Sequence, residues 1–210
     1  MFEKLRLISV MFVAAMGLGS PSSLCAAPSA AEIGVVVMHG KGGGPGKNVN
    51  GLAAAFEGAG FQVANLNMPW SHKRRYDVTM QAGVEEISRA LEIMRARGAR
   101  KVFVAGHSQG GLFALYYAGL HAVDGVLPIA PGGQVDAASN VAQLAPYVEK
   151  AQQMVNEGRG SEKADFAEFE SAKGNIPLST TAAIYLDWFD PNGAHTTRVY
   201  RAVKGGTPVL

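Results

Sequence analysis

From residue 33 onward, the sequence alternates short apolar runs with segments whose apolar residues recur at helical spacing. This alternation is typical of a parallel sheet flanked by helices, because parallel strands need long crossover connections that are usually helical. Residues 33–38 form a continuous run rich in valine, as expected for a strand buried on both faces. We therefore expect an α/β fold with a mostly parallel sheet and helices on both faces.

The predicted strands cover residues 33–38, 61–66, 101–105 and 125–129. Apolar residues at helical spacing predict helices through residues 52–56, 84–94, 110–120, 136–156 and 181–189. Phe166 and Phe169 indicate one further short turn of helix. Two interpretations of residues 136–175 stay open, because this segment can form a cap over a site or ordinary crossover helices.

Composition favours one globular domain and no nucleic-acid partner. The chain has 210 residues, 48% of them hydrophobic, which is enough apolar material for a buried core. The formal net charge is only +2. The densest basic run, residues 72–75, is short and lacks the interleaved aromatic side chains that stack on bases, so it is interpreted as a solvated loop.

The N-terminus has the pattern of an export signal. Lys4 and Arg6 supply positive charge, residues 7–18 are apolar, and small residues follow up to Ala30. We expect a signal peptide over residues 1–27, a domain over 28–210, and export to the periplasm or the medium. The apolar stretch is shorter than the roughly 20 residues that span a bilayer, so no stable membrane span is expected after cleavage.

Cys25 is the only cysteine, and it lies within the expected signal peptide. A chain cleaved after it therefore has no disulfide and no cysteine metal ligand. A lipid anchor on Cys25 is the less favoured alternative, because residues 22–24 (Ser-Ser-Leu) differ from the Leu-small-small run of lipoprotein signals.

Residues 106–110 read Gly-His-Ser-Gln-Gly and lie directly between a predicted strand and a predicted helix. In such a sharp strand-to-helix turn the serine backbone is strained, and the flanking glycines let its Oγ stand above the sheet. The helix N-terminus favours negative charge developing there. Ser108 is therefore a candidate nucleophile, the alternative being a glycine-rich turn with an incidental serine.

With residues 106–111 reading Gly-His-Ser-Gln-Gly-Gly and His39-Gly40 closing the first strand, the chain resembles the α/β-hydrolase family. The resemblance implies a serine hydrolase of the esterase or lipase type, with a small-molecule acyl substrate and no cofactor or metal. Ester, thioester and peptide substrates stay open. It also implies an oxyanion hole formed by the backbone N–H groups of Lys41 and Gln109, each donor being worth about 3 to 4 kcal/mol.

The remaining histidines are not expected to be catalytic. The resemblance makes His39 a structural residue that shapes its loop, and His107 a structural residue that points away from the Ser108 Oγ. His72 and His121 fall in a loop and at a helix end, where exposure is the usual outcome.

A phosphate-binding loop is the competing interpretation of residues 40–48, since a strand, a glycine-rich turn and a helix are common to both designs. The spacing argues against it. Lys41 stands where the pattern requires its first glycine, and Asn48 replaces the Ser or Thr that would hold magnesium.

The resemblance also requires an acid and a histidine after the nucleophile, in that order. Residues 206–210 resemble the opening of the strand that leads to the acid in relatives, so we expect a truncated chain that lacks the last strands and both loops. The rival is an internal set formed by Asp187, Asp190 and His195. Against it, both carboxylates are expected to be solvated or capping and the histidine exposed.

Three functional hypotheses follow from these observations. The first is an active serine hydrolase with Ser108 as nucleophile. The second is a catalytically inactive product or a binding module on the same fold. The third is an exported α/β domain of another kind, in which the resemblance is a coincidence.

Overall fold

The computed structural model describes residues 27–210. The expected signal peptide, with Lys4, Arg6 and Cys25, lies outside the described residues apart from Ala27. Within residues 27–210, no helix is both long and apolar enough to cross a membrane.

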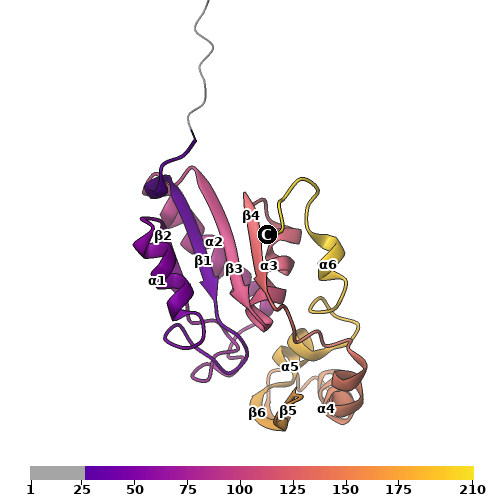
Figure 1. Cartoon of the computed structure of the whole chain (residues 1–210). Coiled ribbons are helices and arrows are strands. Elements are labelled where there is room, and N and C mark those ends of the chain that lie inside the picture. Colours follow the sequence, from indigo (N-terminus) through magenta and orange to yellow (C-terminus); the bar gives the residue numbers. More distant parts are fainter. Residues whose placement is uncertain (1–26) are drawn as a thin grey trace, which may run out of the picture.

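Four parallel strands form the central sheet in the order β2-β1-β3-β4 (Figure 1). They are β1 (Ile33–Met38), β2 (Gln62–Leu66), β3 (Lys101–His107) and β4 (Gly125–Ile129). In this register Val36 pairs with Ala64 on one side and Val104 on the other. The predicted parallel sheet is thus confirmed.

Helices cover both faces of the sheet, as the strand pattern requires. Helix α1 (Asn50–Gly58) packs on the face that carries Val35 and Val37, whereas α2 (Met80–Ala96) and α3 (Gln109–Leu120) pack on the face that carries Val36. A short 3-10 helix (Ala30–Glu32) precedes β1, and α6 (Val199–Ala202) lies near the C-terminus.

Helix α2 illustrates how the sequence sets an element. The Thr79 side chain accepts a hydrogen bond from the Ala82 N–H, which caps the first turn. Its buried face carries the residues predicted from helical spacing, namely Val84, Ile87, Leu91 and Met94. Gly98, with φ +95°, follows the helix and lets the chain turn into β3.

The segment between β4 and α6 contains a β-hairpin that the sequence did not predict. It comprises α4 (Ala138–Asn156), β5 (Lys163–Glu170), β6 (Gly174–Thr181) and α5 (Ala182–Phe189), and β5 pairs antiparallel with β6. The expected helical turn at Phe166 and Phe169 was wrong, because these residues lie on a strand. Two aromatic residues are too short a pattern to distinguish the strand period from the helix period.

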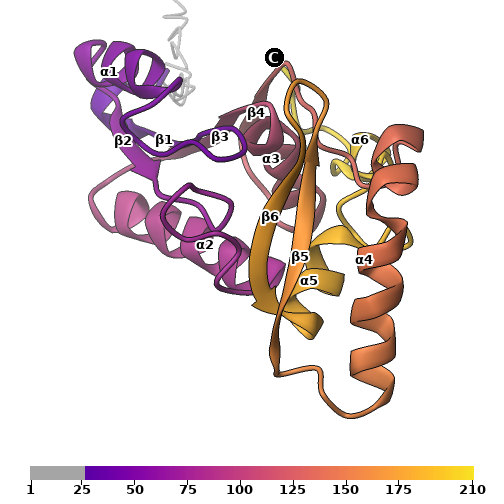
Figure 2. The same ribbon diagram turned by 90° about the horizontal axis from the view of Figure 1, so that it is seen from below.

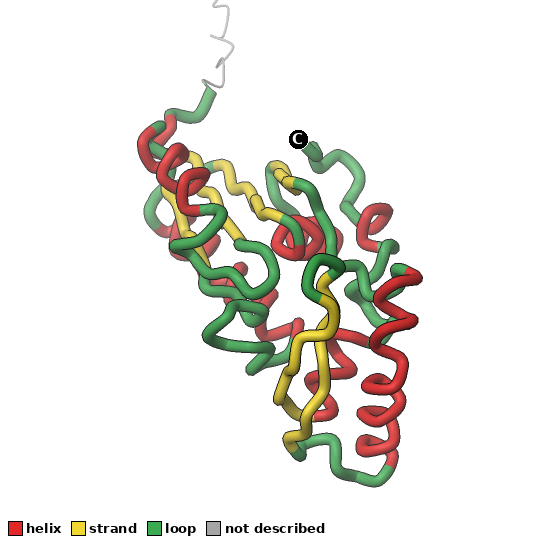
Figure 3. The backbone as a smooth tube through the Cα atoms, turned by 60° about the horizontal axis from the view of Figure 1, so that its bottom comes forward, coloured by secondary structure: helices red, strands yellow, loops and turns green. Residues whose placement is uncertain are grey.

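We call residues 138–189 the hairpin unit. It is not part of the parallel sheet and lies beyond the carboxyl ends of β1 and β3 (Figures 1 and 2). The tube view shows its hairpin and its long helix side by side (Figure 3). The loop after β2 holds it in place, because Thr180 Oγ1 donates to the Tyr76 carbonyl and Trp188 Nε1 to the Val78 carbonyl.

Candidate functional site

Ser108 has the strained backbone expected of a nucleophile in a sharp strand-to-helix turn. It stands between β3 and α3 with φ +54° and ψ −119°, a region that non-glycine residues rarely adopt. Its N–H donates to the Ile129 carbonyl at 2.9 Å. A Cβ at Gly106 would lie 2.3 Å from the Gly110 backbone, so only glycine fits this turn.

Ser108 opens into a cavity of about 420 Å³ at the carboxyl edge of the sheet. Four segments that are separated in the sequence form its walls: the end of β1, the end of β3, the loop after β4, and the tip of the hairpin. Among the lining residues are Lys41, Ser108, Gln109, Gln134, Phe169 and Glu170. The cavity therefore depends on the hairpin unit as well as on the sheet.

Lys41 and Gln109 both line this cavity, at the end of β1 and the start of α3 respectively. Neither backbone N–H donates to another residue of the described chain. The loop after β1 is fixed nearby, since the Gly42 N–H donates to the Trp70 carbonyl at 3.0 Å. Two backbone donors near Ser108 are thus available to an oxygen of a bound ligand.

The Lys41 side chain connects the loop after β1 to the hairpin unit. Its Nζ donates to the Phe169 carbonyl at 2.8 Å and lies 4.0 Å from Glu168 Oε2. Burial lowers the pKa of Lys41, opposed by the charges of Glu168 and Glu170. The sequence had suggested no role for this side chain, because its partner lies 128 positions away.

Tyr76 makes a second connection between the hairpin unit and the site. Its buried hydroxyl lies 2.9 Å from Glu168 Oε2 and 3.2 Å from the side-chain oxygen of Gln109. Burial raises the pKa of Tyr76, and the nearby Glu168 charge adds to this effect, so the hydroxyl stays protonated and can donate. Nothing in the sequence had singled out Tyr76 or Glu168.

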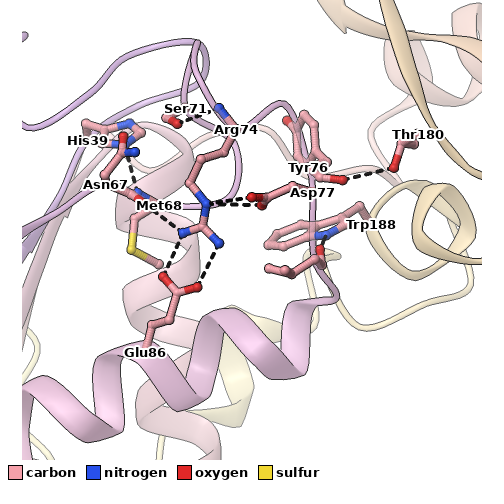
Figure 4. Close-up of polar contacts among 11 residues, drawn as sticks. His39, Asn67, Met68, Ser71, Arg74, Tyr76, Asp77, Glu86, Thr180 and Trp188 are labelled. Carbon is pink, nitrogen blue, oxygen red and sulfur yellow. Dashed lines mark hydrogen bonds and ion pairs between the residues drawn. The ribbon is translucent and has the colours of Figure 1, made fainter.

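The loop that carries Tyr76 is anchored to α2 by Arg74 (Figure 4). The Arg74 guanidinium makes two hydrogen bonds of 2.7 Å to the Glu86 carboxylate and also contacts Asp77 and the Asn67 carbonyl. Hydrogen bonds to Glu86 raise the pKa of Arg74. The basic run is therefore only partly a solvated loop, because Arg74 belongs to a bidentate ion pair.

His39 is fully buried and shapes the loop after β1. Its Nδ1 lies 2.8 Å from the Gly40 carbonyl, and its Nε2 accepts a hydrogen bond from the Met68 N–H. The Nδ1 proton therefore points at the carbonyl, and burial lowers the pKa of the ring.

His107 lines the Ser108 cavity, and its Nδ1 has no hydrogen-bond partner among residues 27–210. His72 and His121 are exposed.

His195 is 2% exposed, so the expectation of an exposed ring was wrong. The ring lies edge-on to Phe113 of α3 and Trp188 of α5, so it packs among the aromatic side chains of these two helices. Its Nε2 has no partner among the described residues. Burial, reinforced by the Lys41 charge and opposed by Asp136, lowers the pKa of His195 to about 3. The ring does not line the Ser108 cavity.

The two predicted carboxylates do not contact His195 in the described structure. Asp187 Oδ2 accepts a hydrogen bond from the Met80 N–H at 2.6 Å, and Asp190 Oδ1 accepts one from the Asn192 N–H at 2.8 Å. Both therefore cap backbone turns. The acid whose charge acts on His195 is Asp136, which the sequence had not indicated.

Over residues 27–210, no group of three or more His, Cys, Asp or Glu side chains is arranged to hold a metal ion.

A four-stranded parallel sheet, helices on both faces and a serine in a strained turn at the carboxyl edge define an α/β-hydrolase fold. Solved structures of this fold are similar to the chain. One is described as LipS and LipT, two metagenome-derived lipolytic enzymes (TM-score 0.53, 20% identity, 85% of this chain and 70% of that chain). Another is a monoacylglycerol lipase of Paleococcus ferrophilus (TM-score 0.53, 20% identity, covering 84% of this chain and 71% of that chain).

A third similar structure is Est1E of Butyrivibrio proteoclasticus with bound ferulic acid, at 16% identity and a TM-score of 0.52, covering 84% of this chain and 66% of that chain. None of the curated proteins compared with the chain matches it. A family model described as "Protein of unknown function (DUF1749)" matches residues 26–194, and the chain belongs to this family.

Proposed function

We propose that the protein is a serine hydrolase that acts on an ester or another acyl substrate, with Ser108 as nucleophile. The observation that carries this proposal is the strained Ser108 backbone at the floor of a cavity with two free backbone donors. Strain of this kind persists where a side chain has to be presented in one direction. The similar solved structures described as a lipase, lipolytic enzymes and Est1E support an ester substrate.

In the proposed reaction, the Ser108 Oγ attacks the acyl carbon while a base takes its proton. When the oxyanion intermediate collapses, the bond to the leaving group breaks and the protonated base gives its proton to the leaving group. The backbone N–H groups of Lys41 and Gln109 hold that oxyanion, and water then releases the acyl group.

His195 is the proposed base and Asp136 the proposed acid, in preference to Asp187 and Asp190. His195 is neutral near pH 7, and its Nε2 has no partner within residues 27–210. Its ring has to leave the contact with Phe113 and Trp188 to reach the cavity, and contact with water then returns its pKa toward the ordinary value. Asp136 follows Ser108 and precedes His195, which is the order that α/β-hydrolases use.

A fluorophosphonate probe tests the nucleophile, because it reports an activated serine without a known substrate. We expect the folded protein to be labelled, the Ser108→Ala variant to be unlabelled, and labelling of a His195→Gln variant to be at least about a hundredfold slower, within the usual range for loss of a general base. Equal labelling of wild type and Ser108→Ala would reject Ser108 as nucleophile. Unchanged labelling of His195→Gln would reject only the base.

A binding protein without turnover is the second candidate function. One observation favours it: the Ser108 Oγ makes no hydrogen bond to any residue of the described chain, so no base is in place beside it. Folded protein that binds acyl compounds but is never labelled would establish this alternative.

Export is part of the proposal. The signal peptide expected over residues 1–27 should be removed by cleavage before residue 28, and N-terminal sequencing of the secreted or periplasmic protein tests this. An N-terminal Cys25 carrying lipid would favour the membrane-anchored alternative.

A further inference from the structure

A second cavity of about 330 Å³ adjoins the Ser108 cavity. The two have Glu170 in common. On the Ser108 side, Lys41 Nζ donates to the carbonyl of Phe169, the residue that precedes Glu170. The loop after β1, the loop after β2 and the hairpin of β5 and β6 together form its walls. We call this space the side cavity.

The side cavity has an apolar floor and a basic rim. Trp70, Tyr76 and Leu178 form the buried floor, each no more than 3% exposed. The rim carries four basic side chains, Lys47, His72, Arg75 and Lys173. The His72 N–H donates to the Gly43 carbonyl at 3.1 Å. This hydrogen bond joins the loop after β2 to the loop after β1 and fixes this part of the cavity wall.

The charges of this cavity do not cancel. Lys173 makes two hydrogen bonds to the Glu170 carboxylate, at 2.9 and 3.0 Å. Glu168 already receives the Tyr76 hydroxyl and lies near Lys41. Within the described chain, no carboxylate pairs with Lys47 or Arg75, although an Arg75 N–H donates to the Pro177 carbonyl. Two positive charges above an apolar floor are thus left for a ligand.

We propose that the side cavity binds an anionic group, a carboxylate or a phosphate, that is joined to the rest of the ligand by an apolar segment. The apolar segment packs on Trp70 and Leu178, and the anion faces Lys47 and Arg75. Because this cavity meets the Ser108 cavity at Glu170, the inference specifies the substrate class of the proposed hydrolase: acyl compounds that carry a negative charge. This last step rests on the proposed function, but the binding site does not.

Binding can be tested without turnover, using hexylphosphonate as an anionic probe and hexanol as its neutral counterpart, with isothermal titration calorimetry on the Ser108→Ala protein. We expect hexylphosphonate to bind at least about tenfold more tightly than hexanol, because hydrogen bonds to a charged group are stronger than those to a neutral one. Lys47→Gln and Arg75→Gln should each weaken hexylphosphonate binding about threefold to tenfold and leave hexanol binding unchanged.

Arg89→Gln is the matched control, because Arg89 is exposed on α2 and does not line the side cavity. Circular dichroism melts show whether each variant is folded. The Lys47 variant preserves the test if the Arg75 variant is unstable, since Arg75 has φ +50° and contacts the hairpin. Equal affinity for the two probes, or an affinity loss in Arg89→Gln as large as in Lys47→Gln, would overturn the proposal.

Turnover then separates this inference from the proposed function. With the wild-type protein, the mono-4-nitrophenyl ester of adipic acid should have a lower KM than 4-nitrophenyl hexanoate, and Lys47→Gln should remove the difference with little change in kcat. If hexylphosphonate binds as expected but no fluorophosphonate labels Ser108, the hydrolase proposal fails and the anion site stands. If the neutral ester has the lower KM, the substrate class is wrong.

Discussion

The Tyr76 hydroxyl lies 2.9 Å from the Glu168 carboxylate, which joins the loop after β2 to the hairpin strand β5. The same hydroxyl contacts the Gln109 side chain at 3.2 Å, and Gln109 is one of the two residues whose backbone N–H is proposed to bind the oxyanion. The Lys41 side chain, from the other such residue, contacts the next residue of the same strand, Phe169. Both halves of the proposed oxyanion hole are therefore held by the hairpin unit.

Removing this hydroxyl should slow the reaction more than it weakens substrate binding. In Tyr76→Phe, Gln109 loses one of its positioning contacts, and we expect kcat or the fluorophosphonate labelling rate to fall about tenfold with a smaller change in KM. The free energy of unfolding should fall by roughly 1 to 2 kcal/mol, because a buried hydrogen bond is lost. Steady-state kinetics and urea unfolding measure the two effects.

Tyr117→Phe provides the matched control. The Tyr117 hydroxyl lies 3.0 Å from Ser88 Oγ on α2, so this variant also loses a hydrogen bond but not one near Ser108. A similar loss of stability with unchanged kinetics is expected. Kinetics that change equally in both variants would indicate that Tyr76 acts only through overall stability.

The strained backbone at Ser108 predicts a gain in stability when the side chain is removed. Ser108 has φ +54°, which glycine adopts readily, and such strain costs of order 1 to 3 kcal/mol. Glycine loses more backbone entropy on folding, which offsets part of this gain. The free energy of unfolding of Ser108→Gly should therefore be about 1 kcal/mol higher than that of the wild type.

Ser108→Ala distinguishes strain from the loss of the hydroxyl. Alanine retains the Cβ and therefore the strain, so this variant should be no more stable than wild type while it also loses probe labelling. Thermal melts of the three proteins make the comparison. Equal stabilisation in the alanine and glycine variants would show that the turn is not strained.

The parallel sheet was predictable because its signals are local. The run from Ile33 to Met38 and the strand before Gly106 are buried on both faces, and that constraint leaves few residue types at each position. The turn at Ser108 was predictable for the same reason, since a Cβ at Gly106 has no room. These features depend on residues adjacent in sequence.

The contacts that complete the site were not predictable, because they join residues far apart in the sequence. Tyr76 and Glu168 are 92 positions apart, and each resembles an ordinary loop or surface residue in its own segment. The β5–β6 hairpin was missed because its alternation is irregular, with Phe166 and Ala167 both buried. The burial of His195 follows from how the chain after α5 packs against Phe113, which no local pattern records.

Arg74 should not be replaceable by lysine. Its guanidinium contacts Glu86 through two nitrogens and Asp77 through a third, and a single ammonium cannot reproduce this geometry. We expect Arg74→Lys to lower the free energy of unfolding by about 1 to 2 kcal/mol, because the side chain is only 18% exposed and its hydrogen bonds are charge-assisted.

Arg159→Lys is the matched control for this change. Arg159 also contacts two carboxylates, those of Glu157 and Glu162, but its side chain is 48% exposed. An exposed pair of that kind contributes little to stability, so we expect the free energy of unfolding to be nearly unchanged and the loss to be much smaller than in Arg74→Lys. Urea unfolding of both variants tests the prediction, and a larger loss in Arg159→Lys would contradict the proposed anchoring by Arg74.

The buried His195 predicts a loss of stability in mild acid. Its pKa falls from the ordinary 6.5 to about 3 on folding, so between these values the unfolded chain binds a proton that the folded chain does not. The free energy of unfolding should therefore decrease as pH falls below 6.5, approaching a slope of about 1.4 kcal/mol per pH unit from this group. In His195→Phe that contribution is absent, so the decrease between pH 7.5 and 5.5 should be shallower than in the wild type. Parallel pH dependence in wild type and His195→Phe would mean that His195 is not buried as a neutral ring.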